Sequence, residues 1–174
     1  ACVAAAAAGC AVGITANYYL DKVRADYSNL EDQLDATKEQ IQKSIASTSS
    51  LKNSTEELLK DDSAEADRIV KNIKDGKAQK SDLDKKIKEM DSNLAYMKKR
   101  LEQDKEVYNA HKGTQSALMQ GQGAKPNSIS LARKKNEEVS LQLANADNEL
   151  NELENAVIEY SKKTASYKRI QEGL

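Results

Sequence analysis

The sequence predicts an all-α protein built from long helices that pack along narrow apolar seams. Phe and Trp are absent, charged residues make up 32% of the chain, and Gly (7) and Pro (1) are scarce. Aromatic side chains usually supply much of a globular core's buried area, so a round core is hard to build from this composition. Ala, Glu, Lys and Leu are abundant instead, which is typical of long helices with most of their surface in water.

Apolar residues recur in heptads from residue 20 onward, a spacing typical of a coiled-coil seam. We therefore expect a long heptad helix over residues 21–110. Its first seam weakens through residues 44–55, where Ser and Thr occupy core positions. A second register follows, offset by four residues, and such a stutter locally unwinds a supercoil. The first seam consists of Leu20, Tyr27, Leu34, Ile41, Thr48 and Thr55, alternating with Val23, Leu30, Thr37, Ser44, Leu51 and Leu58. The second consists of Leu59, Ala66, Ile73, Lys80, Ile87, Leu94, Leu101 and Tyr108, with Ile69, Leu83, Met90 and Met97.

This helix is expected to kink or break near residues 60–81, and two sites compete for the break. Asp62 resembles a helix cap with Glu65 reaching back to it. Gly76 is suited to the left-handed position that ends a helix, and Ser81 to capping the next one. The second register continues through Gly76 without a shift, so a continuous or kinked helix stays open as an alternative.

A flexible connection is expected at residues 111–128, because this stretch contains three glycines and the only proline of the chain. Its sequence is HKGTQSALMQGQGAKPNS. His111 is interpreted as a cation at a helix end. Leu118 and Met119 form the one apolar island of the connection and are a candidate partner contact. A returning coiled-coil helix is expected over 129–174. Its third seam consists of Val139, Ala146, Leu153, Tyr160, Tyr167 and Leu174, alternating with Leu143, Leu150 and Val157. Together these elements predict an elongated coiled-coil hairpin or a three-helix arrangement.

Residues 1–20 carry no charge, whereas the chain beyond them is dense with charge. Twenty residues at about 1.5 Å each just span a hydrocarbon core of about 30 Å, so an N-terminal hydrophobic helix that anchors the chain in a membrane is one reading. Tyr18 and Tyr19 lie where interfacial aromatic residues are expected. Ala5, Gly9 and Gly13 form a small-residue stripe that allows close helix packing in a membrane. An Ala-rich helix packed inside the protein is the alternative.

Lipidation is a further reading of this segment. Residues 7–10, Ala-Ala-Gly-Cys, resemble a bacterial lipobox that ends in Cys10, and Cys2 is a second candidate. The sequence begins without Met and without a basic segment, so we expect a processed N-terminus. Eight residues apart on one helix, the two cysteines lie about 12 Å apart along its axis, which is too far for a disulfide within the chain.

Composition argues against several classes of function. With 27 basic and 28 acidic residues, the chain lacks the overall basic character of a nucleic-acid binder. Two cysteines and one histidine do not supply the usual ligands of a metal cluster. No phosphate-binding loop or catalytic set is recognised, so we predict no enzymatic activity, no cofactor and no small-molecule substrate.

An uncharged N-terminal segment followed by a heptad-rich rod resembles bacterial coiled-coil envelope lipoproteins and single-pass coiled-coil envelope proteins. The resemblance covers mainly residues 1–60 and is one of architecture. It implies a structural or adaptor protein of the bacterial cell envelope, with its helices in the periplasm or outside. The expected partners are further copies of the chain or other coiled-coil proteins. A membrane-inserted helical oligomer and a soluble scaffold or filament subunit are the alternatives.

Overall fold

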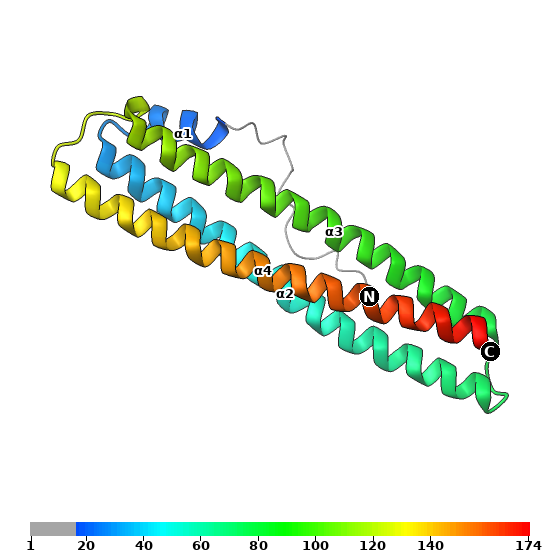
Figure 1. Ribbon diagram of the computed structural model, residues 1–174. Helices are drawn as coiled ribbons and strands as arrows, with labels where there is room; N and C mark the ends of the chain where they lie inside the picture. Colours follow the sequence, from blue (N-terminus) through cyan, green and yellow to red (C-terminus); the bar gives the residue numbers. More distant parts are fainter. Residues whose placement is uncertain (1–16) are drawn as a thin grey trace. The chain divides into compact units, whose positions relative to one another are not determined.

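The computed structural model describes residues 17–174, of which 90% are helical and none lies in a strand. The elements are α1 (Tyr18–Asp26), α2 (Leu30–Lys74), α3 (Lys80–Ala117), a π-helical turn η1 (Leu118–Gln122) and α4 (Ile129–Gly173) (Figure 1). The prediction of an all-α chain is therefore confirmed for these residues. An N-terminal hydrophobic helix is not shown, because the expected segment falls mostly on residues 1–16, outside the described part.

The helices form two compact units, and α2, α3 and α4 each contribute a segment to both. Unit 1 contains Ser50–Leu101 and Glu152–Leu174, and the described part of unit 2 contains residues 17–49 and Glu102–Asn151. Within each unit the segments of α2, α3 and α4 pack against one another. In unit 2, α1 is added to this packing.

The core of unit 2 contains aliphatic side chains from α1, α2, η1 and α4, together with one tyrosine from α3. Leu34, Ile41 and Val139 are fully buried in it, as the heptad spacing predicted. Burial of such side chains stabilises a fold by about 1.5–3 kcal/mol each. The cluster consists of Leu20, Val23, Leu30, Leu34, Ala36, Ile41, Tyr108, Leu118, Ala132, Val139, Leu143 and Ala146.

The core of unit 1 is built mainly from the second and third predicted seams, with Leu51 from the first. Leu83, Met90 and Leu153 are fully buried, whereas Lys80, which shares a row with Ile87, is exposed at the end of its helix. The buried apolar residues are Leu51, Ala66, Leu83, Ile87, Met90, Leu94, Met97, Leu101, Leu153, Ala156, Val157, Tyr160 and Tyr167.

A turn separates α2 from α3 in unit 1. Gly76 adopts a left-handed φ of 68°. Its N–H donates to Ile73 O (3.0 Å), and the N–H of Lys77 donates to Asn72 O (2.8 Å). These two bonds satisfy the last carbonyls of α2 in a Schellman motif. The start of α3 differs from the expected Ser81 cap, because the carboxylate of Asp82 accepts the N–H of Gln79 (3.0 Å) instead.

A break at residues 27–29, between α1 and α2, was not predicted. The side chain of Asn29 accepts the N–H of Asp32 (2.9 Å) and so caps α2. The amide of Gln33 donates to Tyr27 O (2.9 Å), which holds the extended residue in place. Tyr27 is 39% exposed, although its seam position predicted burial.

The structure also corrects the expected flexible connection at 111–128. Helix α3 continues to Ala117, because its inward residues remain buried and a single glycine at 113 costs a helix only about 1 kcal/mol. The remaining connection is bonded to α2: Gln33 accepts the N–H of Ala124 (2.9 Å), and Glu31 accepts the N–H of Asn127 (3.1 Å). A Cβ atom at Gly123 would lie 3.0 Å from side chains of Leu30, Gln33 and Leu118.

Truncation of a core leucine tests the packing of unit 2. We expect Leu34→Ala to lower the free energy of unfolding by about 2–5 kcal/mol, because it leaves a cavity at a fully buried position. Leu141→Ala is the matched control at a site that is 61% exposed, with an expected change within about 0.5 kcal/mol. Urea denaturation followed by circular dichroism measures both. Equal effects of the two substitutions would contradict the assignment of the core.

Candidate functional site

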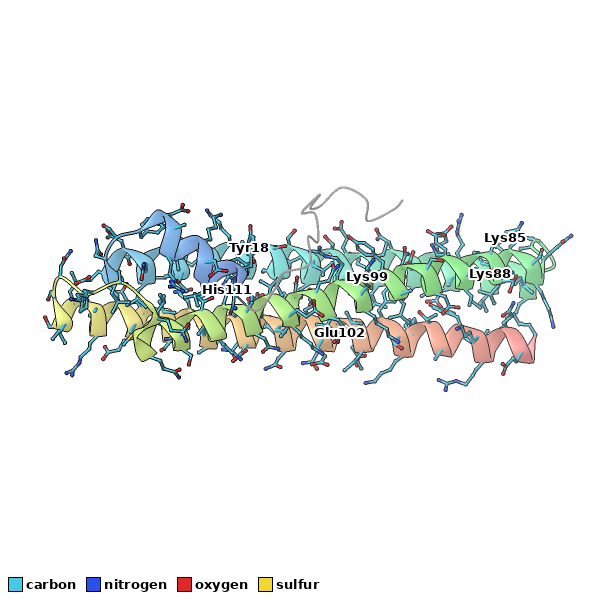
Figure 2. The ribbon with its side chains drawn as sticks, turned by 90° about the horizontal axis from the view of Figure 1, so that it is seen from above. Tyr18, Lys85, Lys88, Lys99, Glu102 and His111 are labelled. Atoms are coloured by element: carbon cyan, nitrogen blue, oxygen red, sulfur yellow. The ribbon has the colours of Figure 1, made fainter. Side chains whose placement is uncertain are left out.

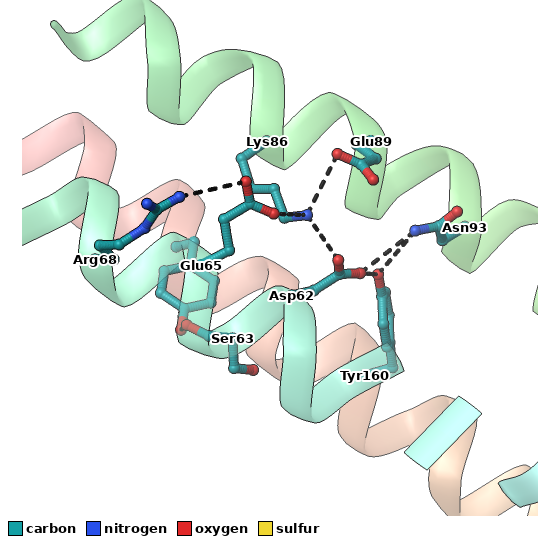
Figure 3. Close-up of polar contacts among 9 residues, drawn as sticks. Asp62, Ser63, Glu65, Arg68, Lys86, Glu89, Asn93 and Tyr160 are labelled. Carbon is teal, nitrogen blue, oxygen red and sulfur yellow. Dashed lines mark hydrogen bonds and ion pairs between the residues drawn. The ribbon is translucent and has the colours of Figure 1, made fainter. Parts of the chain in front are cut away.

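The most distinctive polar site of unit 1 is a buried cluster around Asp62 and Lys86 (Figure 3). Asp62 lies on α2 and is 3% exposed, while Lys86 lies on α3 and is 5% exposed. The Lys86 Nζ atom is 2.7 Å from Asp62 Oδ1. Buried charges are costly unless they are paired and hydrogen-bonded, so this pair requires its surroundings to be complete.

Further carboxylates of unit 1 complete the environment of Lys86. Its Nζ atom lies 2.7 Å from Glu65 Oε2 and 3.3 Å from Glu89 Oε2. Burial disfavours the ammonium, but the bonds to Asp62 and Glu65 outweigh it and raise the pKa of Lys86. Lys86 therefore stays charged, and its three N–H groups are directed at three carboxylates.

The second oxygen of Asp62 faces α3 and α4. The Tyr160 hydroxyl donates to Asp62 Oδ2, and the Asn93 amide donates to Asp62 Oδ2 (3.3 Å) and to the Tyr160 oxygen (3.4 Å). Burial, together with the bond to the Asp62 carboxylate, raises the pKa of Tyr160. The phenol therefore stays protonated and acts as a donor. The cluster ties three helical segments together at one level of unit 1.

The burial of Asp62 corrects its interpretation as a helix cap. Helix α2 runs through this residue without interruption. Asp62 comes seven residues after Thr55, which is the next position of the first seam row. An ionised side chain at a seam position is costly unless it is paired and hydrogen-bonded, as Asp62 is here. The heptad position was the one signal that pointed to burial.

A second polar cluster lies in unit 2 around Thr48 of α2. The Tyr108 hydroxyl donates to Thr48 Oγ1 (2.7 Å), and Thr48 Oγ1 donates to Asp104 Oδ2 (2.8 Å). Burial raises the pKa of Tyr108 to about 12. As in unit 1, the hydroxyl of a tyrosine at a seam position donates a hydrogen bond to a polar side chain of α2.

His111 lies in the same unit and is fully buried. Its Nε2 atom is 3.0 Å from Ser44 Oγ, and its ring lies 4.2 Å, centroid to centroid, from the ring of Tyr19 on α1. Figure 2 shows His111 on α3 beside α1. Burial lowers the pKa of His111 to about 4, so it is neutral at pH 7. The interpretation of His111 as a helix-end cation is therefore wrong.

The other sequence-predicted site residues divide into two groups. Five candidates for lipidation or membrane helix packing lie outside the described residues: Cys2, Cys10, Ala5, Gly9 and Gly13. The remaining four are placed by the structure. Tyr18 is 46% exposed, and Tyr19 packs against His111 as described above. Leu118 is buried (1% exposed) within unit 2, so its side chain is not exposed for the expected partner contact, whereas Met119 is 41% exposed.

Two further findings concern residues 17–174. None of their helices is both long enough and apolar enough to cross a membrane. These residues also contain no group of three His, Cys, Asp or Glu side chains placed to hold a metal ion.

An open groove of about 470 Å³ lies between α2 and α4 in unit 1. Its lining includes two acidic and three basic side chains, with Lys162 Nζ 2.7 Å from Glu159 Oε1. None of the lining residues is buried, so the groove lacks the desolvated ionisable group that usually marks a catalytic cleft. They are Glu56, Leu59, Lys60, Ser63, Glu159, Lys162, Lys163 and Ser166.

Comparison with protein families, curated proteins and solved structures finds no match to this chain.

A double-mutant cycle tests the Asp62–Lys86 pair. We expect Lys86→Met to destabilise unit 1 by about 3–5 kcal/mol, because it leaves the buried Asp62 carboxylate without its cation. Asp62→Leu should cost less, because Glu65 and Glu89 still face Lys86. The double substitution should cost about 0.5–3 kcal/mol less than the sum of the two. The exposed pair Asp84–Lys88 (2.7 Å) is the control, with a coupling below about 1 kcal/mol. Strictly additive effects at Asp62 and Lys86 in denaturation experiments would show that the pair is not coupled.

The neutral state of His111 predicts a pH dependence of stability. The folded pKa of about 4 lies below the ordinary value of 6.5, so the unfolded state binds more protons between these values. The free energy of unfolding should therefore fall as the pH drops from about 6.5 to about 4, by up to about 3 kcal/mol, and this contribution levels off below about 4. Denaturation curves of the wild type and His111→Gln should converge as the pH drops through this range. Parallel pH profiles would argue against a buried neutral histidine.

Proposed function

We propose that this chain is a non-enzymatic structural or adaptor protein of the bacterial cell envelope that mediates protein–protein assembly. The proposal that the chain is not an enzyme rests on one observation. The ionisable side chains with the most altered environments, Lys86, Tyr160 and His111, are buried and bonded or packed between helices of their own unit. Such groups hold helices in register and do not reach a substrate.

The long helices support a role in assembly. A helix of 45 residues, the length of both α2 and α4, presents an extended surface at about 1.5 Å per residue. Its outer face carries closely spaced charges of both signs. Surfaces of this kind set partner choice and orientation in coiled-coil assemblies. The partners we propose are further copies of the chain or other coiled-coil proteins.

Attachment to a membrane is the part of the proposal that rests on residues 1–20. Their lack of charge, the two cysteines and the stripe of Ala5, Gly9 and Gly13 support an anchor. Tyr18 remains 46% exposed and so is available to an interface.

Fractionation of cells that express the full chain tests the anchor. We expect the protein to stay with the membrane fraction through a high-salt wash and to be released by detergent, because an apolar or lipid anchor is insensitive to salt. A salt-resistant integral membrane protein and a cytosolic enzyme serve as markers. Release of the intact chain by salt alone would contradict anchoring and favour a soluble scaffold.

Sedimentation of the detergent-solubilised protein tests the assembly. A small defined oligomer, or a complex with another helical protein, is the expected result for an adaptor. A large uniform oligomer would instead support a membrane-inserted helical ring. A monomer at every concentration, without a partner in the membrane fraction, would contradict the proposal.

A further inference from the structure

The turn between α2 and α3 in unit 1 concentrates positive charge. Residues 71–80 contain four lysines, at positions 71, 74, 77 and 80, which we name the lysine turn. All four are exposed, and the one acidic residue among these ten is Asp75. Between residues 67 and 88 there are eight basic and four acidic residues, although the whole chain has a net charge of −1.

The lysine turn differs from its surroundings because its lysines form no ion pairs within residues 17–174. Nearby basic residues pair with carboxylates on their own helices: Arg68 with Glu65 (3.9 Å), Lys85 with Asp82 (3.7 Å) and Lys88 with Asp84 (2.7 Å). Within residues 17–174, no ion pair engages the four lysines of the turn. Their charges are therefore directed to solvent.

Only two of the four lysines lie where a positive charge stabilises the fold. Lys71 and Lys74 lie in the last turn of α2, where a cation interacts favourably with the helix dipole. Lys77 follows Gly76 outside either helix. Lys80 is the first residue of α3, where the dipole disfavours a cation. The positive end of α3 thus adds to the potential of the lysines instead of compensating it.

The end of α4 lies at the same end of unit 1. Its Gln171 side chain donates to Asp84 Oδ1 (3.4 Å), and Lys168 Nζ is 2.7 Å from Asp91 Oδ1. Figure 1 shows the C-terminus close to the α2–α3 turn, and Figure 2 shows Lys85 and Lys88 near this turn. Arg169 and Glu172 are both exposed on this last stretch of α4, so it adds one charge of each sign.

The chemistry of these residues selects a class of partner. Lysine ammoniums on flexible stems bind phosphate groups as point charges and do not require a fixed geometry. Residues 68–88 include no aromatic side chain on which a nucleic-acid base could stack. The charges surround a protruding turn, which meets a broad anionic surface more readily than it follows a single strand.

We propose that the lysine turn binds the phosphate headgroups of anionic lipids at a membrane surface. Clusters of four or more lysines bind such surfaces, and each contributes about fivefold to the affinity. The interaction is electrostatic and weakens as salt is added. It does not depend on residues 1–20, so it adds a second, salt-sensitive contact to the proposed anchor.

Vesicle co-sedimentation of the full chain at low salt tests this proposal. The probes are vesicles of phosphatidylcholine alone and vesicles that also contain phosphatidylglycerol. The test variant carries Lys71→Gln, Lys74→Gln, Lys77→Gln and Lys80→Gln. The matched control carries Lys43→Gln, Lys98→Gln, Lys99→Gln and Lys125→Gln, which removes the same charge at exposed positions elsewhere. Circular dichroism checks that both variants keep their helices.

We expect the wild type and the control variant to prefer the anionic vesicles, and the test variant to lose about tenfold or more of this preference. Equal loss in both variants would overturn the proposal, because it would show a general effect of net charge. Tighter binding to duplex DNA than to anionic vesicles at the same salt would overturn the choice of lipid. Binding to neutral vesicles reports on residues 1–20 alone, so a failed anchor and a failed lysine turn give different results.

Discussion

The fold of each unit depends on hydrogen bonds made at seam positions by side chains that are buried and polar. The chain contains no Phe, so its large core residues include tyrosines, and every buried hydroxyl requires a partner. The hydroxyl of Tyr108 donates to Thr48, and that of Tyr160 donates to Asp62. The hydroxyl of Tyr167 donates to Asp67 Oδ1 (2.7 Å). In each case a tyrosine of α3 or α4 bonds to α2. A shift of one helix by a turn would leave these groups unpaired, so they fix the register of otherwise similar heptads.

Ionisable side chains have different roles in the interior of the units and on their surface. Ionisable groups that are desolvated, such as Lys86 and His111, are enclosed between helices and serve packing. Some exposed charges pair within one helical turn, as Arg68 does with Glu65 and Lys88 with Asp84. The lysine turn instead places four exposed lysines within ten residues, and no ion pair engages them within residues 17–174. Assembly through helical surfaces and contact with anionic lipid are therefore compatible roles on different parts of the chain.

The apolar part of the fold was largely predictable from spacing. Leu34, Met90 and Val139 are buried as their heptad positions indicate, and Gly76 ends α2 because a left-handed residue favours glycine. The polar interior was not predictable. Asp62 and Asp104 continue the seam rows by one heptad beyond Thr55 and Met97, but their partners lie far along the chain and cannot be inferred from local pattern. The break before Asn29 was missed because a single capping side chain decides it.

Native-state hydrogen exchange measures most directly whether polar layers hold the units together. Slow exchange is expected for the amides around Asp62, Lys86 and Tyr160 in unit 1, and around Thr48 and Tyr108 in unit 2, because opening there requires loss of buried bonds. Protection at these layers should match that of the apolar layers at Leu34 and Leu153. Rapid exchange at the polar layers alongside protected apolar layers would contradict this account.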